Sequence, residues 1–341
     1  MPEAGLKTLD DVATCAWVGV LIHAPVEAVE ALADGDSDGH RIGRRILGPI
    51  EEQVLRTRRR FAATRVYIQV TRGPVRIVLS RKGFDSGSGG VPSPILDGAL
   101  VSIPIPTSRR SVTTYDDIGL GNLVRDLTRG RIGASHFCHH DPDLRVGALG
   151  QVGRAQSHLE KNAVGPGDLL LFWGLFRRAS LRSSGYRYVA DAPREHWVFG
   201  WLQIGEVLHL GPDGSWAAGK FPKLIAHPHC RPGWPANNTL YLATEELHFG
   251  KVSLGLPGVG MFAKASEPLR LSVTDGPTSL WRVPRWLNPR HGGTGLTYHS
   301  SDNRWTDGTL QTVGRGQEFI ATLVDPVDAL AWLEVILEEA R

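Results

Sequence analysis

The chain has 341 residues, of which 41% are hydrophobic and 21% charged, with a formal net charge of +3. These values are typical of a soluble globular protein of one or two domains and differ from those of a strongly basic nucleic-acid binder. The three scattered cysteines exclude a disulfide framework, and no apolar run is long enough to span a membrane. The N-terminus lacks a secretory signal pattern, so we expect a cytoplasmic protein.

Residues 1–73 differ from the rest of the chain in charge. Residues 1–40 contain eight acidic side chains and one lysine, whereas 41–73 contain nine arginines and two glutamates. Apolar residues at helical spacing predict a basic amphipathic helix over about 40–62. Three interpretations of this extension stay open: a basic arm that binds nucleic acid or a partner, a disordered segment, or an over-extended gene start upstream of Val75.

The remainder, 74–341, is expected to form a single domain. Runs of apolar, β-branched and aromatic residues predict strands at 75–80, 100–105, 168–174, 186–190, 196–210, 239–243 and 269–273. Helices are predicted at 118–129, 146–162 and 326–340, the last with Asp325 as N-cap and Pro326 at its first position. Because strands outnumber helices and do not alternate regularly with them, we predict an α+β fold. It would be one domain rich in mixed or antiparallel sheet, with a few peripheral helices.

The first strand runs into a polar, glycine-rich loop, in which residues 80–90 read SRKGFDSGSGG. Backbone N–H groups in such a loop can bind an anion or a metal-bound ligand. We therefore take Arg81, Lys82 and Ser86 as candidates for substrate binding and Asp85 as a candidate catalytic residue. An ordinary flexible exit from a strand is the alternative, because glycine loops are common.

A second polar segment, residues 136–143, packs three imidazoles, a thiol and two carboxylates into eight residues. Imidazole and carboxylate together suit Fe(II), Mn(II) or Zn(II). In an extended segment His139, Asp141 and Asp143 would share one face, and Pro142 favours an extended conformation at Asp141. The alternative is a turn whose aspartates cap a following helix.

Further histidines extend the set of candidate ligands. His227 and His229 are two residues apart around a proline, with Cys230 next to them, and His158 lies on a predicted helix. His299 is a weaker candidate for a ligand or for acid–base catalysis. Histidines of this kind also occur as ordinary core or surface residues.

Near the C-terminus, residues 314–319 read GRGQEF. Arg315 could bind a phosphate or carboxylate through two N–H groups, and Glu318 could act as a general base or orient a ligand imidazole. A tight turn before the last strand is the alternative. The sequence contains no Walker A motif, no G-x-G-x-x-G after a strand, no G-x-S-x-G elbow and no zinc-deaminase signature.

The order of these segments resembles the nucleotide modification associated domain 3 family over about residues 75–341. Its most specific parts are Ser80–Ser86 and the H-x-D-P-D-L block from His139 to Leu144. The resemblance implies a nucleobase or nucleotide substrate. It supports His139, Asp141, Asp143 and His158 as candidates, but it gives no support to His140.

Taken together, the sequence predicts a metal-dependent enzyme that modifies a nucleobase or nucleotide. The first choice is non-haem iron bound by His139, Asp141, Asp143, His158, His227 and His229. Three alternatives stay open: a tailoring enzyme acting on a peptide or natural product, a metal-dependent hydrolase or nuclease, and a non-catalytic nucleic-acid-binding module. A local basic patch for nucleic acid could come from Arg109, Arg110, Arg125, Arg129, Arg131 and Arg145.

Overall fold

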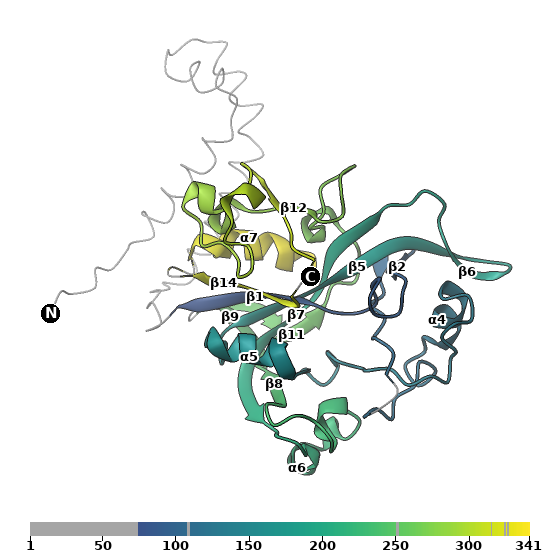
Figure 1. Cartoon of the computed structure of the whole chain (residues 1–341). Coiled ribbons are helices and arrows are strands. Elements are labelled where there is room, and N and C mark those ends of the chain that lie inside the picture. The colour runs from purple at the N-terminus through teal and green to yellow at the C-terminus, as the bar shows by residue number, and fades with distance from the viewer. Residues whose placement is uncertain (1–73, 108–109, 250–251, 315, 324, 326) are drawn as a thin grey trace, which may run out of the picture. The chain divides into compact units, whose positions relative to one another are not determined.

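The computed structural model describes residues 74–341 except 108–109, 250–251, 315, 324 and 326 (Figure 1). The predicted N-terminal extension with its basic helix, Arg109 and Arg315 therefore lie outside the described residues. Within the described part, no helix has the length and apolar character needed to cross a membrane.

The described residues form one large sheet, two small two-stranded sheets and a few helices. The strands are β1 (Val75–Arg81), β2 (Ser93–Leu96), β3 (Ala99–Leu100), β4 (Ala148–Gln151), β5 (Leu169–Arg182), β6 (Gly185–Tyr188), β7 (Arg194–His209), β8 (Thr239–Ala243), β9 (Glu246–Phe249), β10 (Val252–Pro257), β11 (Val259–Met261), β12 (Leu280–Arg282), β13 (Thr309–Gln311) and β14 (Glu318–Leu323). The α-helices are α4 (Gly121–Leu127), α5 (Gly153–Lys161), α6 (Ser215–Lys220) and α7 (Val327–Glu338). Short 3₁₀ helices are η1 (Pro222–Leu224), η2 (Pro228–Cys230), η3 (Glu267–Leu269), η4 (Arg285–Leu287), η5 (Pro289–His291) and η6 (Asp302–Arg304).

The large sheet follows the strand order β14-β1-β5-β7-β8-β4. β1 and β5 are parallel, whereas the other neighbours along this path are antiparallel. Although β4 and β14 end the path, Gln151 of β4 donates a hydrogen bond to Glu318 of β14. The sheet therefore curls until side chains of its two end strands meet. The expected α+β fold with a mixed sheet is confirmed.

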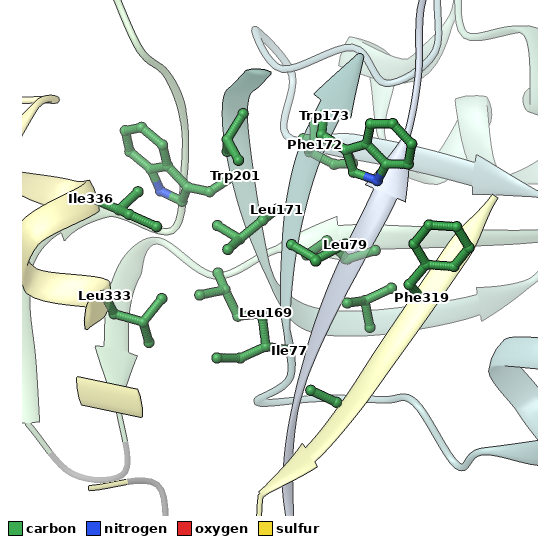
Figure 2. Packing of buried hydrophobic residues seen from close by; sticks show 14 of the residues in the cluster. Ile77, Leu79, Leu169, Leu171, Phe172, Trp173, Trp201, Phe319, Leu333 and Ile336 are labelled. Atoms are coloured by element: carbon green, nitrogen blue, oxygen red, sulfur yellow. The ribbon is translucent and has the colours of Figure 1, made fainter. Parts of the chain in front are cut away.

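One face of the sheet packs against α7. Ile77 of β1 pairs with Leu169 of β5, and Leu79 pairs with Leu171, so that alternate apolar side chains project to one side (Figure 2). Leu333 and Ile336 of α7 complete this core cluster, since residues three and four apart share one helix face. β5 can be apolar on both faces because it lies in the interior of the sheet, with helices on either side.

The opposite face carries polar residues as well as apolar ones. Ser80 of β1 lies across from Glu318 of β14, and both side chains are buried. α5 covers this face: the Tyr241 hydroxyl of β8 donates to the Gln156 Oε1 at 3.0 Å. Figure 1 shows α5 and α7 on opposite sides of β1 and β14. A buried polar layer of this kind is unusual in a core and marks the face where the candidate sites lie.

The structure corrects three of the predicted elements. Residues 146–162 were expected to be one helix, but they form β4 followed by α5, because Gly147 and Gly153 both have positive φ. The predicted strand at 100–105 ends at Leu100, where a proline-containing segment follows. Residues 269–273 begin with the last residue of η3 and continue as a segment with two isolated bridges, at Arg270 and Ser272, rather than as a strand.

Candidate metal centre

Three predicted ligands from two distant segments meet in the structure. One ligand atom each from His139, Asp141 and His229 lies within 4.8 Å of the others, and the group could hold a metal ion. Asp141 Oδ2 is 3.6 Å from His139 Nε2 and 3.8 Å from His229 Nε2. Ligand atoms about 2.1 Å from a shared metal lie about 3.0–3.4 Å apart. A small inward movement of the two rings would therefore bring all three atoms onto one ion.

The other carboxylate oxygen of Asp141 is held by the protein. The backbone N–H of Gly150, on β4, donates to Oδ1 at 2.8 Å, and His227 Nε2 lies 3.2 Å from the same oxygen. Burial by itself raises the pKa of Asp141, but its contacts with His139 and His227 outweigh burial and hold that pKa well below its usual value. Asp141 is therefore an ionised carboxylate with Oδ2 directed toward the two imidazoles.

The orientation of His229 is fixed by Asn238. His229 Nδ1 is 2.6 Å from Asn238 Oδ1, so Nδ1 carries the proton and Nε2 has a free lone pair. Burial lowers the pKa of His229 to about 3, so the ring is neutral near pH 7. Nε2 and Asp141 Oδ2 are then two acceptor atoms facing each other in a buried site. Such an arrangement is favourable when a cation lies between them, and the donor set thus fits a metal.

His227 has a different role from His229. Its Nδ1 accepts the backbone N–H of His229 at 3.3 Å, at the start of η2. A ring that accepts at Nδ1 carries its proton on Nε2, which lies 3.2 Å from Asp141 Oδ1. In this tautomer His227 orients the carboxylate instead of binding the ion. Cys230 lies in an apolar cluster, where burial and the charge of Asp141 raise its pKa to about 11, so it stays a thiol.

Two further predicted ligands lie apart from this group. Asp143 accepts the backbone N–H of Arg145 at 3.2 Å and lies 3.5 Å from His140 Nδ1, so it holds the turn before β4 and caps no helix. His158, on α5, bonds through Nε2 to Thr297 Oγ1 at 3.1 Å and stacks on the Tyr298 ring. The described geometry thus brings neither Asp143 nor His158 to the metal group.

A second polar cluster surrounds Glu318. Lys82 Nζ is 2.8 Å from Glu318 Oε1, and Gln151 Nε2 donates to the same oxygen. Glu318 is only 1% exposed, and within the described residues its Oε2 has no hydrogen-bond partner. The hydroxyl of Ser80 directly across the strand pair is likewise buried and unpaired. Since each unpaired buried polar group costs about 1–3 kcal/mol, this cluster has unused capacity to bind a polar group.

β4 connects the two clusters. Gly150 binds Asp141 through its backbone, and the next residue, Gln151, binds Glu318 through its side chain. Consecutive Cα atoms are about 3.8 Å apart, so the metal group and the Glu318 cluster contact neighbouring points of one strand. The arrangement can therefore combine a metal ion with a buried carboxylate near it.

The remaining candidates that the structure describes bond to neighbouring groups of the chain or lie in an exposed turn. Asp85 accepts the N–H groups of Gly87 and Ser88 at 2.7 Å, and its other oxygen pairs with Arg81 at 2.5 Å. Ser86 is exposed in this turn. His299 is buried, with Nδ1 bonded to Thr297 O at 2.8 Å and Nε2 accepting from Val313 N at 3.2 Å. Both of its ring nitrogens are therefore occupied.

Comparison with known families decides where this chain belongs. The model of nucleotide modification associated domain 3 matches residues 76–322. The chain belongs to this family. The resemblance expected from the sequence is thereby confirmed, and both the metal group and the Glu318 cluster lie inside the matched region. No curated protein and no solved structure matches this nucleotide modification associated domain 3 protein.

Sequence reasoning missed three residues that shape the centre. Gly150 supplies an N–H group and Asn238 orients His229, while Trp234 stacks on the His229 ring with 4.2 Å between ring centroids. Gly150 and Asn238 carry no signal in their own neighbourhoods of the sequence. Trp234 lies five residues after His229, and a search for aromatic residues near the candidate ligands would have found it.

Proposed function

We propose that this protein is a metal-dependent enzyme that modifies a nucleobase or nucleotide, with Fe(II) held by His139, Asp141 and His229. The observation that carries the proposal is the convergence of these two imidazoles and one carboxylate, in which the ionised Asp141 faces the unprotonated Nε2 of His229. Membership of the nucleotide modification associated domain 3 family supports the substrate class.

The ligand types favour iron among the divalent metals. Two histidines and one carboxylate are the donor set of non-haem Fe(II) oxygenases, in which the remaining coordination positions stay open for O₂ or water and for the substrate. A zinc site with mixed thiolate ligands is disfavoured here, because Cys230 is held as a thiol outside the group. Mn(II) accepts the same ligands as Fe(II), and the metal content of the protein separates the two.

Around this centre, the side chains of His227 and Asn238 and the backbone N–H of Gly150 would hold Asp141 and His229 in place. His227 and Gly150 fix one oxygen of Asp141, which leaves the other directed at the ion. Asn238 fixes the tautomer of His229. Partners of this kind raise metal affinity because they orient the ligands before the ion binds.

Glu318 is the residue we propose to handle the substrate. Its Oε2 can accept a hydrogen bond from an N–H or O–H group of the substrate, and Lys82 Nζ lies 2.8 Å from its other oxygen. Ser80 offers a second hydrogen bond from the neighbouring strand. A nucleobase amine or amide edge presents donors of the kind that such a pair would bind.

Elemental analysis of protein purified without chelator tests the proposal. We expect about one iron per chain in the wild type and less than about one-tenth of that in His139→Ala or His229→Ala. His248→Ala is the control, since His248 is a partly exposed histidine 3.5 Å from Glu246 and outside the group. Full metal retention by His139→Ala would overturn the assignment. Metal-dependent phosphodiester cleavage without O₂ uptake would replace the oxygenase proposal with a hydrolase.

A further inference from the structure

The surface next to the metal group carries an arginine, Arg110, that has no acidic partner among the described residues. The guanidinium carbon of Arg110 lies 4.5 Å from the Trp234 ring centroid. Trp234 stacks on His229 with an interplanar angle of 9°, and its centroid is 5.9 Å from that of His139. A guanidinium, an indole and a ligand imidazole are thus stacked in sequence, from an exposed side chain to the metal group.

This stack leaves the hydrogen-bonding edge of Arg110 unused. Among the residues that the structure describes, Arg110 forms no hydrogen bond and no ion pair. Trp234 is itself fixed, because its Nε1 donates to Pro228 O at 3.0 Å. A guanidinium held over an aromatic ring keeps its N–H donors in its own plane, where they can contact a bound group.

Arg231, two residues after His229, is also unpaired. Its Nε is buried without a hydrogen-bond acceptor in the described part of the chain. Arg145, in contrast, has the Asp143 carboxylate 3.4 Å from its Nε. Two guanidinium groups in the segments around the metal group therefore have no anionic partner in the part of the chain that the structure describes.

We propose that Arg110 and Arg231 bind the phosphate of a nucleotide whose base lies at the metal group. This inference rests on the proposed function, and it identifies the substrate as a phosphorylated nucleotide rather than a free base or nucleoside. Phosphate is the anion that guanidinium binds most specifically, because two parallel N–H groups match two phosphate oxygens. Trp234 sets the distance between the phosphate contact and the ion, and it presents a rigid edge to the sugar.

Calorimetric titration tests the inference with protein loaded with Mn(II). The probes are the four deoxynucleoside 5′-monophosphates, the matching nucleosides and a single-stranded trinucleotide. We expect at least one monophosphate to bind at least about tenfold more tightly than its nucleoside. Arg110→Ala or Arg231→Ala should remove most of this preference while nucleoside affinity and metal content stay unchanged. Arg145→Ala is the matched control and should keep the preference.

The outcomes separate this inference from the proposed function. Equal binding of monophosphates and nucleosides, no binding of any monophosphate, or an unchanged preference in both arginine variants would overturn the phosphate site. A tenfold preference for the trinucleotide over every monophosphate would support the site and identify a nucleic-acid strand as the source of the phosphate. If the protein binds no metal yet prefers monophosphates, the phosphate site stands and the proposed metal centre fails.

Discussion

Gly150→Ala is the substitution that most directly tests the geometry of the metal group. A Cβ built at Gly150 would lie 2.7 Å from Nδ1 of His229 and still closer to two carbons of that ring. Ordinary contact begins at 3.4 Å, so the ring must retreat by at least about 0.7 Å. Ligand distances in metal sites tolerate deviations of only about 0.2 Å. The added methyl group therefore displaces one ligand and disturbs the strand that holds Asp141.

The expected losses follow from this displacement. Removing a partner that merely orients a ligand costs about 10–100-fold in metal affinity, so displacing His229 itself should cost more than about 100-fold. Overpacking at a buried position should also lower the free energy of unfolding by about 1–3 kcal/mol. Competition titration with a fluorescent metal chelator measures the affinity, and urea denaturation of the metal-free protein measures the stability.

Gly165→Ala serves as the control, because a Cβ there would meet no atom within 4 Å and the backbone φ is not positive. We expect this variant to bind metal like the wild type. If Gly150→Ala also bound metal with wild-type affinity, His229 would not lie over Gly150 as described, and the ligand assignment would be refuted.

Two further predictions concern buried ionisable side chains of the sheet, Glu318 and His196. Lys82→Met leaves Glu318 buried without its cation and should lower the free energy of unfolding by about 3–5 kcal/mol in urea denaturation, whereas Arg125→Ala, which removes an exposed pair with Asp126, should change it by less than about 1 kcal/mol. Equal effects of the two substitutions would contradict the burial of Glu318. His196 accepts a hydrogen bond from Trp281 Nε1, and burial lowers its pKa to about 3, below the ordinary 6.5. A depressed histidine pKa stabilises the folded state above pH 6.5, and this stability is lost as the pH falls from 6.5 toward 3. Between pH 7 and pH 5 the wild type should therefore lose about 2 kcal/mol more than His196→Gln, and parallel pH profiles of the two proteins would refute this account.

Much of the sheet could be predicted because its strands carry strong local patterns. β1 and β8 are short apolar runs, and the structure places them at or within one residue of their predicted bounds. Residues 146–162 were misassigned because apolar spacing there fits a helix, while Gly147 and Gly153 adopt conformations that the spacing does not encode. The hydrogen bond from the Gln151 side chain of β4 to the Glu318 side chain of β14 depends on the curl of the whole sheet, which no local sequence pattern records.

The residue types of the candidate site could be predicted from the sequence, but which of these residues contact one another could not. His139, Asp141 and His229 have the chemistry of metal ligands, and their sequence neighbours Asp143 and His227 have it equally. Their roles differ because the backbone directs Asp143 to Arg145, and because the N–H of His229 fixes the tautomer of His227. Contacts of this kind depend on a few ångströms of backbone placement, and composition and spacing cannot supply them.

The separation of 88 positions from Asp141 to His229 has a consequence for how the chain assembles. An ion shared by these residues would close a long loop, and the entropy lost on closing a loop grows only slowly with its length. Such an ion would bind weakly to an incomplete chain, since β4 and β8 must pair before both ligands are in place. Metal uptake would then report that synthesis and folding have passed residue 243, and it would protect the finished domain from proteolysis.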